Sequence, residues 1–221
     1  MPPAKSHDVP PPSHWPNEVI YLVKPRLSPW FPPCIIPLIT TTTTKTFAPR
    51  PVKHPAHVMI KRITQGSHPA NGQSGLFASK KIRDDELIIP YLGILHVTYT
   101  SVDADEILED EHSSSDYDLS LLRLSASDLR NPFGTCAPLS TEKARHISIG
   151  VDAAKMGNAA RFVNDYRGIN TIGPNAEFRV GNGEGGEARM EIWSLKGKGG
   201  IGKGDEILVS YGKGWWGARK G

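Results

Sequence analysis

Short runs of apolar residues alternate with turn-forming residues along the chain from His57 onward. The runs are rich in Val, Ile, Leu, Tyr or Phe and are bounded by Gly, Asp, Asn or Pro, a pattern typical of strands. They are HVMIKRI, GLFASKKI, ELIIPYLGILHV, YDLSLLRL, HISIGVD, AEFRV, ARMEIWSL and EILVSYG. Helical periodicity is weak and limited to a turn or two near residues 103–110 and 153–162. The pattern predicts one mainly β domain over residues 57–216, with few short helices and a tail at 217–221.

The first 56 residues have a different pattern. Fourteen of the 19 prolines lie between Pro2 and Pro55, whereas all 22 glycines lie at Gly66 or later. Proline removes backbone donors and fixes φ, so neither a helix nor a central strand runs through such a segment. We therefore predict that residues 1–56 form a proline-rich, largely disordered arm. Its apolar stretch from Trp30 to Ile39 is either a docking peptide or a segment laid onto the folded domain.

Composition excludes several classes of protein. The net charge of +3 is small, and the Lys and Arg residues are scattered rather than clustered, so we expect no direct nucleic-acid partner. Cys34 and Cys136 make one disulfide at most and cannot form a zinc site by themselves, so we expect no metal. No apolar run is long enough to span a bilayer, and we expect neither a signal peptide nor a membrane partner. These features predict a protein of the nucleus or the cytoplasm.

Three segments carry candidate chemistry. The first, residues 71–93, has a glycine-rich turn that lets a ligand approach the backbone, although such turns are also ordinary structure. The second, residues 152–175, embeds polar side chains in an apolar stretch, as either a binding site or a polar staple for a loop crossing. The third, residues 202–216, is a strand followed by Tyr211 and two tryptophans, and a tyrosine there is either catalytic or at the edge of the core.

Taken in order, these segments resemble the SET-domain family of protein-lysine methyltransferases. The family opens with a glycine-rich turn, a Phe-Ala-like strand, an acidic turn and Tyr-x-Gly. Its middle signature is Asp-Ala, Gly-Asn, Arg-Phe-Ile-Asn-His-Ser and Pro-Asn, and it closes with Gly-Glu-Glu-Leu and Tyr-Gly. The matching residues here are Gly75-Leu76-Phe77-Ala78, Glu86 and Tyr91-Leu92-Gly93, then Asp152-Ala153, Gly157-Asn158, Arg161-Phe162-Val163-Asn164 and Pro174-Asn175, and finally Gly204-Asp205-Glu206-Ile207 and Tyr211-Gly212. The resemblance implies small curved sheets with the middle signature threaded through a loop made by the closing segment.

The resemblance also implies a site that binds S-adenosylmethionine and methylates a lysine by direct in-line transfer. The implied catalytic residue is Tyr211, and Asn164 would hold the methionine part of the cofactor. Aromatic rings suit the adenine and the sulfonium cation. The implied cofactor-binding residues are Gly75, Leu76, Phe77, Arg161, Phe162, Asn164, Asp165, Trp215 and Trp216. The implied substrate channel is lined by Tyr117, Phe178 and Val209.

The chain departs from the family's pattern at several positions. The Asn-His-Ser triplet reads Asn164-Asp165-Tyr166, and Arg167 stands where a cysteine often follows. Two residues rather than one separate Gly72 from Gly75, and Ser210 replaces a common acidic residue before Tyr211. The three-cysteine segment that follows the tyrosine in many relatives is not found.

These observations predict a methyltransferase acting on a lysine-rich segment of a histone or another basic protein. Two alternatives remain at this stage. One is a catalytically weak module that binds cofactor or peptide, suggested by Asp165. The other is an interaction scaffold that acts through the proline-rich arm. The acidic stretch Val102–Glu111 lies in a variable insertion over about residues 100–145, and it either attracts a basic substrate or is a solvated loop.

Overall fold

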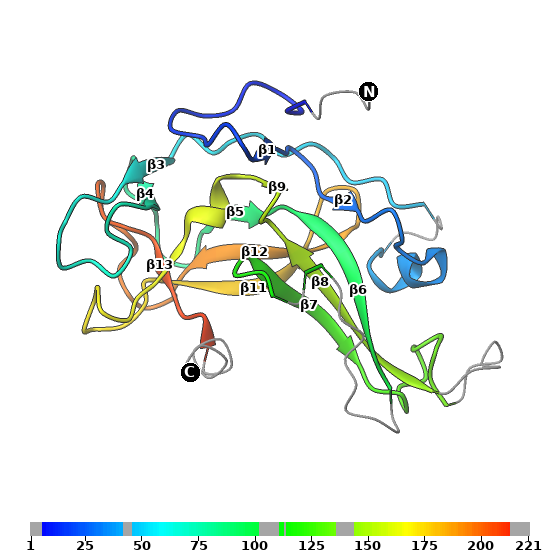
Figure 1. The fold of residues 1–221 in the computed structure, drawn as a ribbon. Coiled ribbons are helices and arrows are strands. Elements are labelled where there is room, and N and C mark those ends of the chain that lie inside the picture. The colour runs from blue at the N-terminus through cyan, green and yellow to red at the C-terminus, as the bar shows by residue number, and fades with distance from the viewer. Residues whose placement is uncertain (1–5, 42–45, 102–110, 113, 136–143, 213–221) are drawn as a thin grey trace.

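The computed structural model describes residues 6–41, 46–101, 111–112, 114–135 and 144–212 as a set of small β-sheets. The strands are β1 (Ile20–Tyr21), β2 (Arg26–Leu27), β3 (Val58–Arg62), β4 (Ser74–Ala78), β5 (Leu87–Tyr91), β6 (Ile94–Ser101), β7 (Asp118–Leu124), β8 (Arg145–Asp152), β9 (Met156–Gly157), β10 (Asn164–Asp165), β11 (Ala176–Asn182), β12 (Ala188–Ser194) and β13 (Leu208–Val209). Two 3-10 helices, η1 (Pro33–Leu38) and η2 (Ala159–Phe162), complete the described elements (Figure 1). The mainly β prediction is confirmed, and η2 lies within the predicted helical turn at 153–162.

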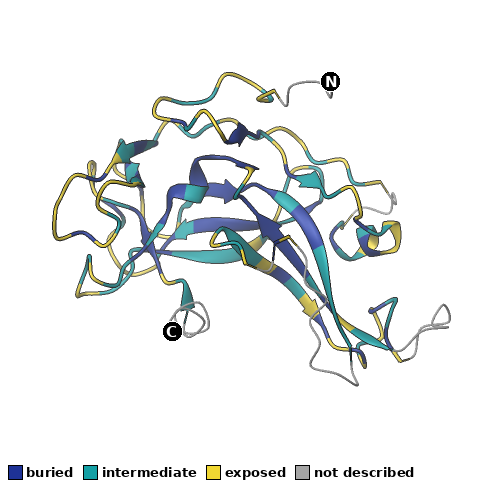
Figure 2. Ribbon diagram, in the orientation of Figure 1, coloured by how far each residue is buried: buried dark blue, intermediate teal, exposed yellow. Residues whose placement is uncertain are grey.

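Two larger sheets form the centre of the molecule. One has the strand order β2-β6-β8-β7 and the other β11-β12-β5. The long antiparallel pairs β6–β8 and β11–β12 form these sheets in regular register. Their inward-facing aliphatic residues are almost completely buried, among them Ile89, Leu95, Ile149 and Ile192 (Figure 2). In β5 and β8 successive residues are buried, 88–91 and 149–152, so both sides of these central strands are covered.

Short parallel pairs join segments that are far apart in the sequence. Strand β1 pairs with β9, β2 with β6, and β10 with β13. Each of the short strands β1, β2, β9, β10 and β13 has only two residues, and the flanking backbone extends the pairing. Leu22 N donates to Gly157 O over 2.7 Å and Ser28 N donates to Leu95 O over 2.9 Å. The N-terminal segment is thus hydrogen-bonded to the domain from Ile20 to Ser28.

The structure corrects the prediction of a largely disordered arm. The described residues 6–41 and 46–56 run side by side across the domain, and Val52 N donates to Val23 O over 2.6 Å (Figure 1). Apolar side chains placed between the prolines enter the core, and they include Trp15, Val19, Tyr21, Phe31, Ile35 and Ile39. The physical reason is that proline stops a regular strand but leaves an extended backbone whose side chains can still be buried. Composition alone does not distinguish that arrangement from disorder.

The apolar stretch from Trp30 to Ile39 lies on the folded domain. This was the second of the two interpretations, the first being a docking peptide. Most of it forms η1 rather than a strand. Ile35 and Ile39 are fully buried, whereas Trp30 is 91% exposed.

No helix among the described residues is long and apolar enough to cross a membrane. The acidic residues 102–110, Cys136, Trp215 and Trp216 lie outside the described residues, and so does the predicted helical turn at 103–110.

Trp15 provides a test of the N-terminal packing. Its ring contacts Tyr21 and Phe162 edge to face, with centroids 5.0 and 5.6 Å apart, and its Nε1 donates to Val19 O over 2.6 Å. We expect Trp15→Ala to lower the free energy of unfolding by about 3–5 kcal/mol, as measured by urea denaturation, because the substitution leaves a large cavity. The matched control is Trp30→Ala, which should change stability by no more than about 0.5 kcal/mol. Equal effects of the two substitutions would show that the N-terminal segment is not part of the core.

Candidate active site

The closing segment, residues 204–211, brings the three predicted segments together. On one side it bonds to β4, where Ile207 N donates to Leu76 O over 2.8 Å and Ala78 N donates to Asp205 O over 2.9 Å. On the other side β13 pairs with β10, and Tyr166 N donates to Val209 O over 3.0 Å. The glycine turn, the middle signature and Tyr211 therefore meet at one place, as the resemblance implies.

Tyr211 is held by its hydroxyl and by its backbone. The hydroxyl donates to Val163 O over 2.7 Å, and the backbone N–H donates to Asp165 Oδ2 over 2.7 Å. Burial above all, then the nearby Asp165 carboxylate and Tyr117 phenol, raises the pKa of Tyr211. The phenol therefore stays protonated at neutral and mildly alkaline pH. Because its hydrogen is used toward Val163, its oxygen remains able to accept a hydrogen bond from another group.

Tyr91 at the end of β5 and Tyr117 in the loop before β7 lie near Tyr211, and Phe178 of β11 lies next to Tyr91. The Tyr91 hydroxyl donates to Tyr117 O over 2.8 Å, and the Tyr91 and Phe178 rings meet edge to face at 6.2 Å. The Arg161 guanidinium lies over the Tyr117 ring, 4.2 Å from its centroid. The structure thus brings Phe178 and Tyr117 to a shared neighbour, Tyr91. The sequence analysis used Tyr91 only as a family landmark and did not include it among the site residues. Its position as an aromatic residue at the end of a buried strand was the signal that could have identified it as one.

Val209, the third predicted channel residue, is fully buried in β13. It is two positions before Tyr211, and its backbone pairs with Asp165. The side chain packs in the core cluster that Tyr211 also contacts.

Glu206 joins two residues from distant segments, His68 and Asn164. Its Oε2 lies 3.0 Å from His68 Nε2, and Asn164 Nδ2 donates to its Oε1 over 2.8 Å. Ala70 N donates to His68 Nδ1 over 3.0 Å, so Nδ1 is the acceptor and Nε2 carries the hydrogen. A carboxylate only accepts, so the amide nitrogen of Asn164 must face Glu206 and the amide oxygen must face away. Among the residues that the structure describes, no group donates to that oxygen.

His68 and Glu206 were not among the predicted site residues. Glu206 belongs to the closing landmark, where its acidic side chain could have been assigned a role. His68 lies in the loop between β3 and β4, and no sequence pattern connects it with a carboxylate that follows 138 positions later.

The predicted glycine turn is required by packing against this network. A Cβ atom at Gly75 would lie 2.7 Å from Glu206 Oε1 and 2.9 Å from the Phe77 ring. Only glycine fits there without moving the carboxylate. Leu76 is fully buried and Phe77 is half-buried beside it. The backbone of β4 therefore lies directly against the group that orients Asn164.

Two departures from the family's pattern, Asp165 and Arg167, are partners. The Asp165 carboxylate accepts from Arg167 N over 2.8 Å and from Arg167 Nη1 over 2.8 Å. The same carboxylate accepts from the Tyr211 backbone. Asp165 is 7% exposed, so its charge is compensated by the guanidinium and by backbone donors. The pair ties the middle signature to the segment that carries Tyr211.

The side chains of Arg161 and Phe162 have structural partners. Arg161 Nε donates to Ala153 O over 2.9 Å, and the Phe162 ring packs against Trp15. Any contact of these two residues with a cofactor would therefore use their backbone. Trp215 and Trp216 lie outside the described residues, and their assignment stays a prediction.

Asp152 anchors the part of the predicted insertion that precedes Tyr117. His112 Nδ1 lies 2.8 Å from its Oδ2, and Ser115 Oγ donates to its Oδ1 over 2.7 Å. The adjacent Ala153 N donates to Tyr117 O over 3.2 Å. Asp152 and Ala153 therefore act as a polar staple, which was one interpretation of the middle signature. The segment that they hold carries Tyr117, a predicted channel residue.

The SET domain family model matches residues 73–212. The chain is also similar to chains of the polycomb repressive complex 2. One is from Chaetomium thermophilum, with 23% identity, a TM-score of 0.42, and 71% of this chain and 15% of that chain covered. Another is in an autoinhibited conformation bound to S-adenosylmethionine, with 23% identity, a TM-score of 0.41, and 70% and 15% covered.

The present chain thus spans only 15% of the length of those chains. No curated protein matches it. The family match covers more than half of the 221 residues and includes the glycine turn, the middle signature and Tyr211. This chain therefore belongs to the SET-domain family.

Proposed function

We propose that the protein transfers methyl groups from S-adenosylmethionine to a lysine side chain of another protein. The observation that carries this proposal is the placement of the Tyr211 hydroxyl. It donates to the carbonyl of Val163, the residue before Asn164, and Tyr211 lies near Tyr91 and Tyr117, while Phe178 packs edge to face on Tyr91. A polar oxygen at the end of an aromatic cluster suits a narrow channel for an amine.

The residues present fit the proposed cofactor. Its methionine part carries an ammonium group, which needs hydrogen-bond acceptors. Asn164 Oδ1 is such an acceptor, and the contact of its amide nitrogen with Glu206 fixes the direction in which it faces. The bond from His68 in turn fixes Glu206. The backbone of Gly75, Leu76 and Phe77 lies along the same network, and the cofactor would lie there together with the backbone of Arg161 to Asp165.

The chain's own residues would orient and desolvate the substrate amine. When bound, S-adenosylmethionine supplies an electrophilic methyl group. An amine attacks only when it has lost its proton, and a free lysine has a pKa of about 10.4. Apolar surroundings of the kind made by Tyr91, Tyr117 and Phe178 disfavour the ammonium form. The Tyr211 oxygen would accept a hydrogen bond from the amine and, with Val163 O, make weak C–H···O contacts with the methyl group. Fixing the amine in line for attack would supply much of the rate enhancement.

The proposed substrate is a protein with a lysine-rich segment, for example a histone tail. A basic segment suits the acidic residues of the insertion before Tyr117, since opposite charges speed encounter. Such substrates occur in the nucleus and the cytoplasm, where we expect the protein to act. The contacts of Asp165 favour catalysis over a module that only binds, because this substitution supports the backbone of Tyr211.

Cofactor binding is tested by replacing Asn164. S-adenosylmethionine at 100 times its Kd should stabilise the protein by about 2.7 kcal/mol and raise the melting temperature. We expect Asn164→Ala to remove this shift, because the proposed acceptor for the ammonium group is lost. The matched control is Asn182→Ala, at an exposed position of β11, which should keep the shift. If the cofactor raises the melting temperature of Asn164→Ala as much as that of the wild type, the assigned cofactor site is wrong.

Catalysis is tested by removing the Tyr211 hydroxyl. Tyr211→Phe should lower kcat by roughly 10²–10³-fold with little change in cofactor affinity, as for the loss of one oriented polar group in a transition state. Steady-state kinetics with a histone peptide measures both quantities, and Tyr99→Phe is the control because the Tyr99 ring packs against Phe133. Since burial raises the pKa of Tyr211, the rate should rise with pH as the substrate lysine loses its proton, without a decline from phenol ionisation up to pH 10. Full activity of Tyr211→Phe would refute the catalytic role.

The number of methyl groups transferred depends on the space at the end of the channel. Phe178 has no hydroxyl to hold a water molecule there, and Val209 is small. We therefore predict a di- or trimethylated product. Mass spectrometry of a peptide after exhaustive reaction measures this, and a product that stops at one methyl group would contradict the assigned channel residues.

A further inference from the structure

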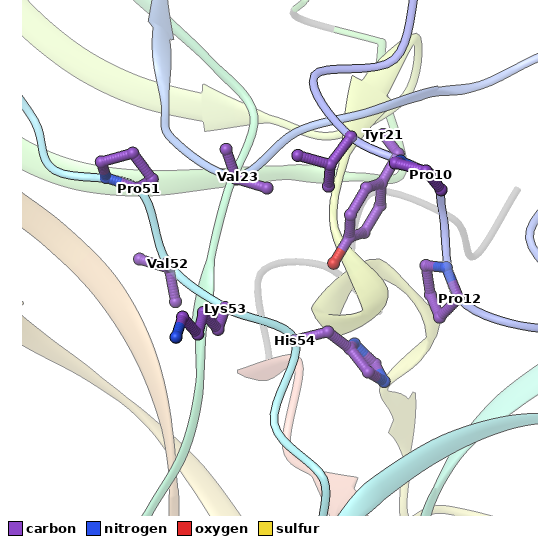
Figure 3. A pocket seen from close by; sticks show the side chains of 9 residues that line it. Pro10, Pro12, Tyr21, Val23, Pro51, Val52, Lys53 and His54 are labelled. Carbon is purple, nitrogen blue, oxygen red and sulfur yellow. The ribbon is translucent and has the colours of Figure 1, made fainter.

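A cavity of about 310 Å³ lies outside the candidate active site, between segments that precede the SET-domain match. Its walls come from three pieces of chain, residues 9–12, residues 21–23 and residues 51–54 (Figure 3). The cavity exists because the N-terminal segments are packed side by side on the domain.

The size and the walls of the cavity suit a small apolar molecule. Ligand pockets have volumes of roughly 300–1,000 Å³, and a cavity of about 150 Å³ already holds benzene. The walls are mainly proline rings, valine side chains and the Tyr21 ring, which are stiff and present flat apolar surfaces. Lys53 is exposed and is the single group on the wall with a fixed charge.

Tyr21 and His54 place polar atoms without partners at this cavity. Tyr21 is 2% exposed, and its backbone N–H donates to His7 Nδ1, but no described residue bonds to its hydroxyl. His54 Nδ1 is buried and also has no hydrogen-bond partner. Figure 3 shows the Tyr21 hydroxyl directed toward the side of the cavity where His54 lies. A buried polar atom without a partner destabilises a protein by roughly 1–3 kcal/mol, so the unbonded His54 Nδ1 favours a ligand group that donates to it, and the Tyr21 hydroxyl at the same cavity can donate to that group.

We propose that this cavity binds a small phenol, that is, an aromatic ring with one hydroxyl group. The ring would pack against the prolines and Val23, while the hydroxyl would accept from Tyr21 and donate to His54 Nδ1. Burial raises the pKa of Tyr21, which keeps it a donor, and burial above all lowers the pKa of His54, which keeps its ring neutral and able to accept. A carboxylate fits less well, since only Lys53 could compensate its charge.

The site is connected with the candidate active site through aromatic rings. Tyr21 packs edge to face on Trp15, and Trp15 packs edge to face on Phe162. Phe162 directly precedes Val163, whose carbonyl accepts from Tyr211. A phenol in the cavity would therefore press on the far end of a row of rings that supports the middle signature. Binding itself does not depend on the proposed methyl transfer.

The test is a titration of the full chain with 4-ethylphenol, followed by heteronuclear NMR and calorimetry. We expect saturable binding of one molecule, with shifts centred on Tyr21, Val23 and His54. Tyr21→Phe should weaken binding about fivefold to tenfold, the effect of losing one hydrogen bond. It keeps the ring that packs on Trp15, so the protein should stay folded. Tyr99→Phe is the control and should bind like the wild type.

Matched ligands separate the proposed interaction from others. The methyl ether 4-ethylanisole cannot donate to His54 and should bind more weakly than 4-ethylphenol, and His54→Leu should abolish that difference. Failure to saturate, or equal binding of the phenol and the ether to the wild type, would overturn the proposal and indicate nonspecific partition. Tighter binding of N-acetyl-tyrosine amide than of 4-ethylphenol would also overturn it, because the occupant would then be a peptide side chain.

Discussion

The rest of the structure depends on the backbone pairing of the closing segment. Residues 204–211 bond to β4 on one side and to β10 on the other, and no other described segment contacts both of these through hydrogen bonds. The same segment carries Glu206 and Tyr211, so the orientation of Asn164 and the position of the phenol follow from one set of bonds. The site is therefore assembled by the fold, because each of its polar groups is supplied by a different part of the chain.

Compensation of charge is the second constraint on this region. Asp165 would be unfavourable beside a buried tyrosine if Arg167 and two backbone amides did not face it. Glu206 is similarly satisfied by His68 and Asn164. Polar groups that are fully bonded in a poorly solvated place are rigid, which is the property that an in-line transfer requires of its surroundings.

Sequence reasoning predicted the strands and the order of the three site segments, because alternating apolar residues and short motifs are local signals. It did not predict the packing of the N-terminal segment. Trp15, Tyr21 and Ile35 are separated by prolines without a regular period, so burial leaves no pattern there. It also treated Asp165 and Arg167 as separate departures, since their interaction depends on the conformation of the loop. The contact between His68 and Glu206 depends on tertiary structure alone.

The parallel pair of β1 and β9 has a consequence for the making of this protein. Ile20 pairs with Met156, so the N-terminal segment leaves the ribosome long before its partner is synthesised. Pairing over such a distance in sequence is slow, and until then the apolar residues of the segment face solvent. A strand-forming sequence in that interval would tend to associate with other chains. Proline has no backbone N–H and interrupts such pairing, so the composition that resembles disorder also disfavours association of this segment with other chains.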